Sequence, residues 1–585
     1  MTTHPAIRLA LAQLDVEPNR PDINVRRVLD TIEQQRSRGA DLVVFSEMVV
    51  PGYMIGDAFE REAFLRDCEA YNADIAAASI GLTVIWGNVL VDRAKRNRDG
   101  TVRKYNAAFA ARHGALLPSV VAIKTHLPTY RQFHDRRHFT SLQDLADEEG
   151  VPLSEKLLVH DLALGNATHR VGLMLCEDMW WEDYGVNIAA MLRDNGASFL
   201  VNLSASPWGA GKAAKRDRVV RSLFTDGDGI PLIYVNNVGF QDIGKTMFAF
   251  DGRTAIYDGN GNVVVQAPAH ESTVIEVSFD PQTTKATGRT QPRDDGPREI
   301  HAALVYAIRQ FMANIPLQNV LIGLSGGIDS SVTAALFVEA IGAERVFGIN
   351  MPTRFNSART RTSAERLARN LGIAYAIAPI EESFDHARAT LNAIRFTSAS
   401  GAETVVLLTS FDEENVQARI RGNVLMTISN KRGWMVLTTG NKSEMATGYA
   451  TLYGDMAGGF AVLKDIVKTL VYRLARWRNE QSPAIPQRVI DRAPSAELRP
   501  DQKDQDSLPP YEVLDAVVER YMERDMTAEQ IAGAGFDMGA VREVMRLIRA
   551  SEYKRRQSPP GVRITPRSFG KDWRYPITSG YLPRS

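Results

Sequence analysis

Residues 319–331 read Asn-Val-Leu-Ile-Gly-Leu-Ser-Gly-Gly-Ile-Asp-Ser-Ser, an apolar run that leads into a Gly-Gly turn. A helical pattern follows as far as Ile341 and stops at Gly342. This order predicts a strand, a tight loop and a helix. Such a loop directs unpaired backbone N–H groups and the positive end of a helix dipole at one point, where Ser325, Ser330 and Ser331 add hydroxyl donors. The stretch therefore indicates a site for the phosphates of a nucleotide.

The loop differs from the phosphate loops of kinases and GTPases, because it has no lysine and no Gly-x4-Gly-Lys-Ser/Thr spacing. It carries Asp329, which could hold a Mg²⁺ that bridges phosphate oxygens, or could simply cap the helix. The string Ser325-Gly-Gly-Ile-Asp-Ser-Ser331 resembles the loop of the ATP pyrophosphatase family, whose members adenylate a substrate and release pyrophosphate.

The length and composition of the chain limit the possible functions. With 585 residues the chain is expected to form several domains. Lys plus Arg and Asp plus Glu both number 69, so no net charge attracts nucleic acid or a membrane surface, and small molecules are the expected partners. Only Cys68 and Cys176 are cysteines, which excludes a disulfide framework and a Cys-based zinc site. Without a signal-peptide pattern or a long apolar run, we expect a cytoplasmic protein.

The first half of the chain alternates short strand-like runs with helical patterns, which predicts a layered α/β domain. The predicted strands are Ile7–Leu14, Leu42–Ser46, Leu82–Val91, Tyr105–Arg112, Ser119–Lys124, Val171–Cys176, Phe199–Ser204, Leu232–Asn236 and Phe248–Tyr257. Three of these runs lead directly to the reactive side chains Glu47, Lys124 and Cys176.

Cys176 lies where a strand ends and Glu177-Asp178 are expected to open a helix, whereas Cys68 lies in a helical pattern and is read as a core residue. A nearby lysine and a helix N-terminus would lower the pKa of the Cys176 thiol, so the two acids should face elsewhere. Three groups suffice for amide hydrolysis, namely a thiolate nucleophile, a carboxylate that transfers a proton and a lysine that stabilises an oxyanion. Cys176, Glu47 and Lys124 could supply all of them.

The segments around these three residues resemble the Glu-Lys-Cys blocks of the nitrilase superfamily, and most closely its glutaminase branch. The matching segments are Phe45-Ser-Glu47 with Pro51-Gly-Tyr53, Lys124-Thr-His-Leu-Pro-Thr-Tyr130 and Cys176-Glu-Asp-Met-Trp180. The resemblance implies an αββα sandwich over most of residues 5–278, with Glu47, Lys124 and Cys176 as catalytic residues.

The same resemblance implies a glutamine site formed by Tyr130, Ser206 and Lys212, the last two in or after Asn202-Leu-Ser-Ala-Ser-Pro-Trp208. Ordinary loop chemistry could also explain these three residues. The chain departs from the family in Phe133-His-Asp135-Arg-Arg-His-Phe139, where Asp135 stands in place of the usual glutamate. Because the side chain of Asp135 is shorter than that of a glutamate, the sequence does not decide whether Asp135 acts as a second catalytic acid.

A polar segment rich in proline and glycine, residues 280–298, is expected to be a linker between a domain at residues 1–279 and one at residues 299–585. The second domain should begin with a helix over Ile300–Ile315 and continue with a strand at Val346–Asn350 and a helix at Ser363–Gly372. This alternation predicts a doubly wound parallel sheet with ligands beyond the strand ends. The weakly periodic segments Arg354–Arg361 and Ser383–Phe411 are expected to cover the site.

Two further segments bring polar groups to this domain. Residues 413–421 form a helical pattern that places Asn415 and Arg419 on one face and Arg421 on another, although a solvated ion-paired helix would explain the charges equally well. The predicted strand Met435–Thr439 leads to Glu444, which could share a Mg²⁺ with Asp329.

These segments resemble the NAD synthetase family over about residues 300–565. Further matching blocks are Thr438-Thr-Gly-Asn-Lys-Ser-Glu444, Gly448-Tyr-Ala-Thr-Leu-Tyr-Gly-Asp455, Lys464-Asp-Ile-Val-Lys-Thr469, Pro494-Ser-Ala-Glu-Leu-Arg-Pro500 and Ser507-Leu-Pro-Pro-Tyr511. The resemblance implies an adenine nucleotide α-hydrolase-like fold. It implies ATP contacts from Gly323, Leu324, Ser325, Gly326, Gly327, Ile328, Asp329, Ser330 and Thr439. It also implies Mg²⁺ on Asp329 and Glu444, and deamido-NAD contacts from Asn415, Glu444 and Lys554, although Lys554 could equally belong to a solvated basic tail.

Together the two resemblances imply that glutamine supplies ammonia for the ATP-dependent amidation of deamido-NAD, giving NAD, glutamate, AMP and pyrophosphate. Because free ammonia is largely protonated in neutral water, we expect a shielded passage from Cys176 to the adenylate, as the family has. We also expect the enzyme to be a homo-oligomer. One alternative is the amidation or thiolation of another acceptor, such as a purine nucleotide or tRNA. A second is a nucleotide-sensing scaffold with an inactive glutaminase half.

Overall fold

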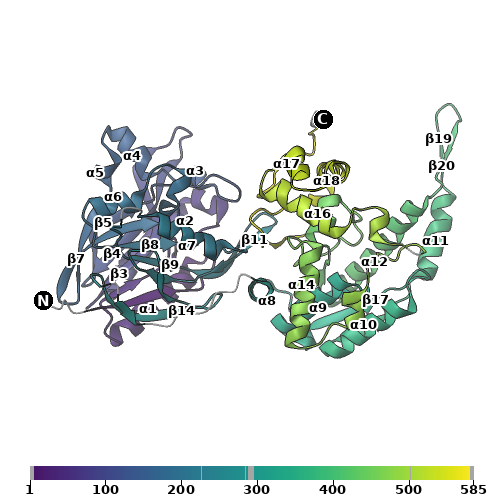
Figure 1. Ribbon diagram of the computed structural model, residues 1–585, viewed down its shortest axis with the longest axis horizontal. Helices are drawn as coiled ribbons and strands as arrows, with labels where there is room; N and C mark the ends of the chain where they lie inside the picture. The colour runs from purple at the N-terminus through teal and green to yellow at the C-terminus, as the bar shows by residue number, and fades with distance from the viewer. Residues whose placement is uncertain (1–5, 225–226, 284, 288–295, 501, 580–585) are drawn as a thin grey trace. The chain divides into compact units, whose positions relative to one another are not determined.

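The computed structural model describes residues 6–224, 227–283, 285–287, 296–500 and 502–579 (Figure 1). The chain divides into two compact units: unit 1 is Met1–Ile243 with Phe248–Asp294, and unit 2 is Gly244–Met247 with Asp295–Ser585. In the described part of the chain, none of the helices combines the length and the apolar character that a membrane span requires.

Unit 1 contains two stacked sheets with helices on both outer faces. One sheet has the strand order β15-β14-β1-β2-β3-β4-β5 and the other the order β13-β12-β9-β8-β7-β6. The strands of the first are β1 (Ile7–Gln13), β2 (Leu42–Val44), β3 (Thr83–Arg96), β4 (Val102–Arg112), β5 (Ala115–Ile123), β14 (Thr273–Asp280) and β15 (Lys285–Thr287). Those of the second are β6 (Val159–Leu164), β7 (Ala167–Leu175), β8 (Phe199–Ser204), β9 (Leu232–Asn236), β12 (Ala255–Tyr257) and β13 (Val263–Gln266).

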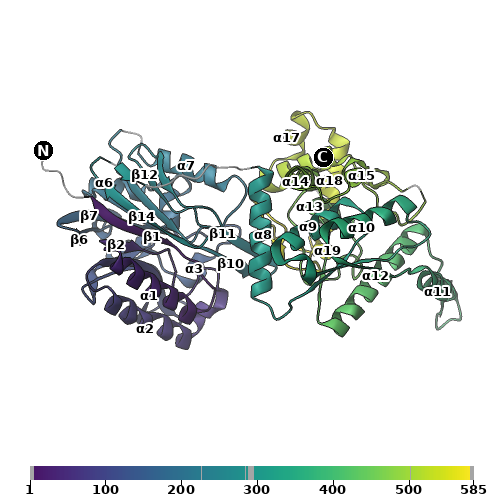
Figure 2. The ribbon, with the colours of Figure 1, turned by 90° about the horizontal axis from the view of Figure 1, so that it is seen from below.

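Strand alternation explains the layers of unit 1. On β2, Leu42 and Val44 point into the core between the two sheets, whereas Val43 points into the outer core against the helices. That outer core is covered by α1 (Pro21–Ser37) and α2 (Glu62–Ala78), which lie side by side in Figure 2. The second sheet is covered in the same way by α6 (Ile188–Asp194) and α7 (Lys212–Ser222). This is the αββα sandwich that the resemblance to the nitrilase superfamily implies.

Shorter helices follow the strands of unit 1, and a hairpin leaves the sandwich. The helices are α3 (Asp135–His138), α4 (Leu142–Glu149) and α5 (Leu153–Lys156), with 3₁₀ turns at η1 (Gly56–Glu60), η2 (Cys176–Met179) and η3 (Trp181–Asp183). The hairpin consists of β10 (Val238–Ile243) and β11 (Thr246–Asp251).

The predicted strand Phe248–Tyr257 is divided into β11 and β12, because the chain bends sharply between them. Gly252 has φ +65° and Arg253 has φ +50°, and a Cβ at Gly252 would lie 2.1 Å from the Gln13 side chain. The residues on both sides of the bend are apolar, so the sequence pattern predicted one continuous strand.

Part of the predicted linker is regular structure. Lys285–Thr287 forms β15, which pairs antiparallel with β14, and the helix α8 (Pro297–Ala313) begins within the expected segment. Residues 284 and 288–295 lie outside the described residues, so the expected limits of the two domains stay a prediction.

Unit 2 is built on a parallel sheet with the order β18-β17-β16-β21. Its strands are β16 (Val320–Gly323), β17 (Val346–Asn350), β18 (Ala374–Ile377) and β21 (Met435–Leu437). Leu321 and Val436 pack against α12 (Ser410–Arg432) on one face. The helices α9 (Ile328–Ile341) and α10 (Ala358–Leu371) contact β17, and α8 and α14 (Lys468–Gln481) contact α9 (Figure 1). The sheet is thus wound on both sides, as predicted.

The segment Ser383–Phe411 is more regular than we expected. It contains most of α11 (Glu381–Asn392) and a hairpin of β19 (Arg395–Thr397) and β20 (Glu403–Val405), which extends beyond α11 in Figure 1. Arg354–Arg361 likewise includes the start of α10. The sequence shows little apolar periodicity over residues 383–411, because Phe384 is the one buried residue of α11 and both strands of the hairpin are exposed. Asn356, Thr360 and Phe411 from these two segments line the cavity of unit 2, which agrees with the expected cover.

The C-terminal part of unit 2 is helical. Its elements are α13 (Lys442–Thr447), α15 (Gln487–Asp491), α16 (Tyr511–Val518), α17 (Ala528–Gly533), α18 (Met538–Ala550) and α19 (Glu552–Arg555), with a 3₁₀ turn at η5 (Asp504–Asp506), a π-helical turn η6 (Glu519–Glu523) and the strand β22 (Gly561–Val562). A further 3₁₀ turn, η4 (Ala343–Arg345), lies earlier, between α9 and β17. Leu514, Val517, Val544 and Ile548 form its core with Met445 of α13.

Candidate active sites

Glu47 and Lys124 meet at one end of the first sheet of unit 1. Glu47 follows β2 and Lys124 follows β5, and Lys124 Nζ lies 2.8 Å from Glu47 Oε1. Asn106 Nδ2 donates to the same oxygen at 2.7 Å, and the backbone N–H of Ala205 donates to Glu47 Oε2 at 2.8 Å. Both ion-paired side chains are buried. Glu47 is therefore a carboxylate with fixed orientation, as a proton shuttle requires.

Asp135 completes this group, although its short side chain left its role open in the sequence. Asp135 Oδ2 accepts from Lys124 Nζ at 2.8 Å, and Asp135 Oδ1 accepts from the Tyr53 hydroxyl at 2.7 Å. Burial alone would lower the pKa of Lys124, but the charges of Asp135 and Glu47 raise it above its ordinary value. Lys124 is therefore an ammonium at neutral pH.

Cys176 stands at the end of β7, in a backbone conformation that is rare for a side-chain-bearing residue, with φ +40°. The helix expected to follow is the 3₁₀ helix η2, which is only 4 residues long. Burial and then the charge of Glu47 raise the pKa of the Cys176 thiol, and Lys124 only partly opposes them. The direction of this shift is opposite to the lowering that we expected, because burial of the sulfur outweighs the effect of the nearby lysine. A base must take the thiol proton.

The two acids after Cys176 have separate roles. Asp178 turns back into the protein, where it accepts the backbone N–H groups of Thr125 at 2.9 Å and His126 at 2.8 Å. Glu177 stays near the sulfur, and its charge raises the pKa of the Cys176 thiol. Burial raises the pKa of Glu177 to about 7. Only Asp178 therefore faces elsewhere in the way we expected.

Of the three predicted glutamine contacts, Tyr130 and Ser206 lie on loops and Lys212 begins a helix. The Tyr130 hydroxyl donates to Glu177 Oε1 at 2.8 Å, and the Tyr184 hydroxyl donates to the same oxygen at 3.1 Å. Lys212 begins α7, its Nζ donates to the carbonyl of Pro207 at 2.8 Å, and its charge lowers the pKa of Cys176. Ser206 is buried directly after Ala205, the residue that holds Glu47. The structure thus brings these residues to the surroundings of the nucleophile.

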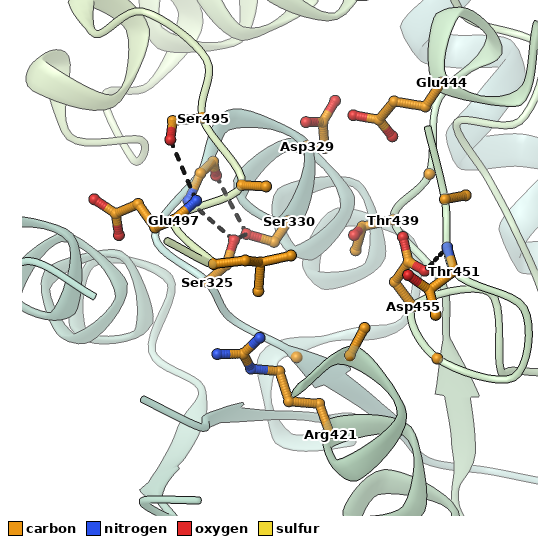
Figure 3. Close-up of a pocket in the computed structure, with 18 of the residues that line it drawn as sticks. Ser325, Asp329, Ser330, Arg421, Thr439, Glu444, Thr451, Asp455, Ser495 and Glu497 are labelled. Atoms are coloured by element: carbon orange, nitrogen blue, oxygen red, sulfur yellow. Dashed lines mark hydrogen bonds between the residues drawn. The ribbon is translucent and has the colours of Figure 1, made fainter. Parts of the chain in front are cut away.

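Unit 2 contains a cavity of about 340 Å³ at the carboxyl ends of its parallel strands. Every residue that the sequence assigned to ATP, Mg²⁺ or deamido-NAD lines it, namely Gly323, Leu324, Ser325, Gly326, Gly327, Ile328, Asp329, Ser330, Asn415, Thr439, Glu444 and Lys554. The loop between β16 and α9 is tightly folded, because the hydroxyl groups of Ser325 and Ser330 lie 3.2 Å apart and the N–H of Gly327 donates to Ser325 at 3.2 Å (Figure 3). The loop can therefore present its remaining N–H groups to phosphates.

Two carboxylates converge at one side of this cavity, as Figure 3 shows for Asp329 and Glu444. Lys468 Nζ lies 2.6 Å from Asp329 Oδ2 and 3.3 Å from Glu444 Oε1. Burial raises the pKa of Glu444 to about 8, with Lys468 opposing and Asp329 adding to the shift. Two carboxylates beside a phosphate loop fit Mg²⁺, which usually binds one or two protein carboxylates together with substrate phosphates.

The wall formed by α12 differs from the prediction. Asn415 lines the cavity and accepts from the Thr451 hydroxyl at 2.7 Å, but Arg419 is exposed and donates to the carbonyl of Leu452. Arg421 lines the cavity instead, and burial lowers its pKa to about 10. The face of α12 that lines the cavity includes residues 414, 418, 421 and 425. Arg419 lies outside this face.

Lys554 is anchored rather than part of a solvated tail, because its Nζ donates to the carbonyls of Gly448 and Ala450 at 2.8 Å each. Other polar residues of the cavity were not assigned from the sequence, namely Tyr449, Asp455, Lys468, Arg492, Glu497 and Asp504. Tyr449, Asp455, Lys468 and Glu497 lie inside blocks that resemble the NAD synthetase family, so that signal could have identified them. The others lie where only the fold brings them together.

Comparisons with known proteins cover both units. A carbon-nitrogen hydrolase family model matches residues 8–289, and an NAD synthase family model matches residues 300–558. A glutamine-dependent NAD(+) synthetase of Thermotoga maritima is 37% identical over 98% of this chain and 99% of its own length. The chain belongs to the glutamine-dependent NAD(+) synthetase family. A second relative with that name, from Acinetobacter baylyi, is 36% identical over 99% of both chains.

Solved structures agree with membership in the glutamine-dependent NAD(+) synthetase family. The Acinetobacter baumannii enzyme of that name, solved in complex with ADP, has a TM-score of 0.70 and 34% identity, and the match covers 99% of this chain and 100% of that one. The Cytophaga hutchinsonii enzyme has a TM-score of 0.75 at 20% identity, with 98% of each chain covered, and supports the fold alone.

Proposed function

We propose that the protein is a glutamine-hydrolysing NAD(+) synthase, which amidates deamido-NAD with ammonia from glutamine and converts ATP to AMP and pyrophosphate. The observation that carries this proposal is the presence of two sites in one chain of this family. A buried Glu47-Lys124 pair lies near Cys176 in unit 1, and a nucleotide-sized cavity with a phosphate loop lies in unit 2.

In the glutaminase reaction, the Cys176 sulfur attacks the side-chain amide carbon of glutamine. Because the resting thiol is protonated, Glu47 accepts its proton as the bond forms. Lys124 stabilises the oxyanion of the tetrahedral intermediate. Glu47 then gives the proton to the departing nitrogen, ammonia leaves, and a glutamyl thioester remains. Glu47 next takes a proton from water, whose attack on the thioester releases glutamate and restores the thiol.

Glutamine is proposed to bind through Tyr130, Ser206 and Lys212. Lys212 supplies a cationic partner for the α-carboxylate of an amino acid, and Tyr130 and Ser206 supply hydroxyl groups. Simple amides lack the α-carboxylate, so this group of residues favours glutamine over them.

In the synthetase reaction, the loop Gly323–Ser330 and Thr439 are proposed to hold ATP. Asn415, Glu444 and Lys554 are proposed to orient deamido-NAD so that its nicotinate carboxylate faces the α-phosphorus. Attack by that carboxylate releases pyrophosphate and gives an acyl adenylate. Ammonia then attacks the acyl carbon, AMP leaves, and the product is NAD.

Asp329 and Glu444 are proposed to hold Mg²⁺, which would offset the charge of the phosphates when bound. Lys468 lies between the two acids and neutralises part of their charge in the protein alone. A shielded passage for ammonia between the two sites and a homo-oligomeric state remain predictions.

The decisive experiment measures NAD formation from deamido-NAD and ATP, with glutamine or ammonium as the nitrogen source. We expect the wild-type protein to use both donors, and Cys176→Ala to use ammonium only. Cys68→Ala is the matched control, because Cys68 is the other buried cysteine and packs in the core next to α1. Absence of NAD formation with either donor, or full glutamine use by Cys176→Ala, would contradict the proposal.

A further inference from the structure

Lys124 has two of its three N–H donors directed at carboxylates. Its Nζ lies 2.8 Å from Glu47 Oε1 and 2.8 Å from Asp135 Oδ2, and all three side chains are buried. An ammonium has three donors and no acceptor, so fixing two of them also fixes the direction of the third. The position of Asp135 therefore decides where the remaining donor of Lys124 points.

Asp135 is in turn held by a phenol. The Tyr53 hydroxyl donates to Asp135 Oδ1 at 2.7 Å, which leaves both carboxylate oxygens engaged. Burial and the charge of Asp135 raise the pKa of Tyr53 far above its ordinary value, so the phenol remains a donor. With a partner on each oxygen, the carboxylate cannot rotate away from Lys124.

Tyr53 is itself fixed at both ends. Gln241 Oε1 accepts the backbone N–H of Tyr53 at 3.2 Å and that of Met54 at 2.8 Å. The ring of Tyr53 packs against Phe133 with centroids 6.2 Å apart, and Lys124 Nζ lies 5.1 Å from its centroid. Because the backbone and the ring of Tyr53 are both held, its hydroxyl group has a fixed position from which it can hold Asp135.

We propose that Tyr53 is a positioning residue for glutamine hydrolysis, whose phenol holds Asp135 against Lys124 and thereby aims the third Lys124 donor at the oxyanion. This inference rests on the proposed glutaminase function and adds a residue to it. An aspartate has one methylene fewer than a glutamate, so its carboxylate reaches Lys124 only if the surrounding structure presents it correctly. The phenol supplies that constraint.

The test is Tyr53→Phe, which keeps the ring and its packing and removes only the hydroxyl. Because Lys124 acts on the transition state, kcat for glutamine hydrolysis should fall by about tenfold or more while KM changes little. Tyr257→Phe is the matched control, because the buried Tyr257 hydroxyl also donates to a carboxylate, Asp217, at 3.0 Å. We expect Tyr257→Phe to keep the wild-type kcat. An unchanged kcat in Tyr53→Phe, or a raised KM alone, would overturn the inference.

A double-mutant cycle separates positioning from a general structural effect. In an Asp135→Asn background, Tyr53→Phe should cost little further activity, because the phenol acts through the carboxylate. Single turnovers with enzyme in excess keep slow variants measurable. An equal loss from Tyr53→Phe in both backgrounds would show that it acts independently of Asp135, which contradicts the inference.

Two readouts distinguish this inference from the proposed function itself. NAD formation with ammonium should be retained by Tyr53→Phe, and its loss would indicate misfolding and overturn the positioning role. If the wild-type protein hydrolyses no glutamine, the proposed function fails. If the wild type hydrolyses glutamine and Tyr53→Phe does so at the same rate, only the further inference fails.

Discussion

Asn441 Nδ2 donates a hydrogen bond to Asp329 Oδ1 at 3.0 Å, which ties the first turn of α13 to the first turn of α9. The same amide caps α13, because Asn441 Oδ1 accepts the backbone N–H of Glu444 at 3.0 Å. One side chain thus sets the spacing between the two acids proposed to hold Mg²⁺, through helix capping rather than direct metal contact.

Asn441→Ala should raise the Mg²⁺ concentration needed for half-maximal NAD formation with ammonium, by about tenfold or more, because it releases Asp329 from its partner. Thr527→Ala is the matched control, since Thr527 caps α17 in the same way on an exposed turn. Both variants should lose about 1 kcal/mol from the missing cap, but only Asn441→Ala should change the Mg²⁺ titration. Equal titrations for the two would refute the prediction.

Gly326→Ala should abolish nucleotide binding. Gly326 has φ +82°, and an added Cβ would lie 2.3 Å from the carbonyl oxygen of Thr360, so the phosphate loop must move. Gly433→Ala is the control for backbone strain without a clash. Gly433 also has a positive φ, +65°, but nothing lies within 4 Å of its added Cβ. ATP binding by calorimetry should be lost in the first variant and retained in the second. Retention in both would show that the loop tolerates the displacement.

The stability of unit 1 should fall as pH rises through neutrality, because of Glu177. Burial raises its pKa from 4.5 to about 7, so the folded state favours the protonated carboxyl. The stabilisation is complete below pH 4.5 and is lost as pH rises through about 7, with a total on the order of 3 kcal/mol.

Urea midpoints between pH 5 and 8 measure this effect. Glu177→Gln should flatten the pH dependence, because glutamine does not titrate. The exposed Glu182→Gln should leave the dependence as in the wild type. Identical pH profiles for Glu177→Gln and the wild type would rule out Glu177 as the cause.

Ammonia from glutamine should reach the adenylate without mixing with bulk ammonium. With ¹⁵N-amide glutamine and excess unlabelled ammonium at neutral pH, the amide nitrogen of NAD should be mainly ¹⁵N by mass spectrometry. The physical reason is that a shielded passage delivers the unprotonated base. Label diluted to the bulk ratio would mean that ammonia escapes first. Cys176→Ala, which should incorporate no label, is the control.

Local sequence was sufficient for the elements that carry a strong pattern. The run at residues 319–331 predicted the strand, turn and helix that form β16, the phosphate loop and α9, because apolar periodicity and Gly-Gly act over a few residues. The strands that end near Glu47, Lys124 and Cys176 were found for the same reason. Resemblance to the two families added the glutamine and nucleotide contacts, which spacing alone does not assemble.

Tertiary packing decided the properties that depend on residues far apart in the chain. Whether Asp135 reaches Lys124 depends on Tyr53, which lies 82 residues before it. The pKa of the Cys176 thiol is raised because folding removes water from the sulfur, an effect that no local pattern reports. Arg421 also lines the cavity together with Asn415, although the helical pattern placed the two on different faces, because the orientation of a helix is set by what it packs against. Chemistry that needs only neighbours in sequence could be predicted, whereas chemistry that needs burial and distant partners required the fold.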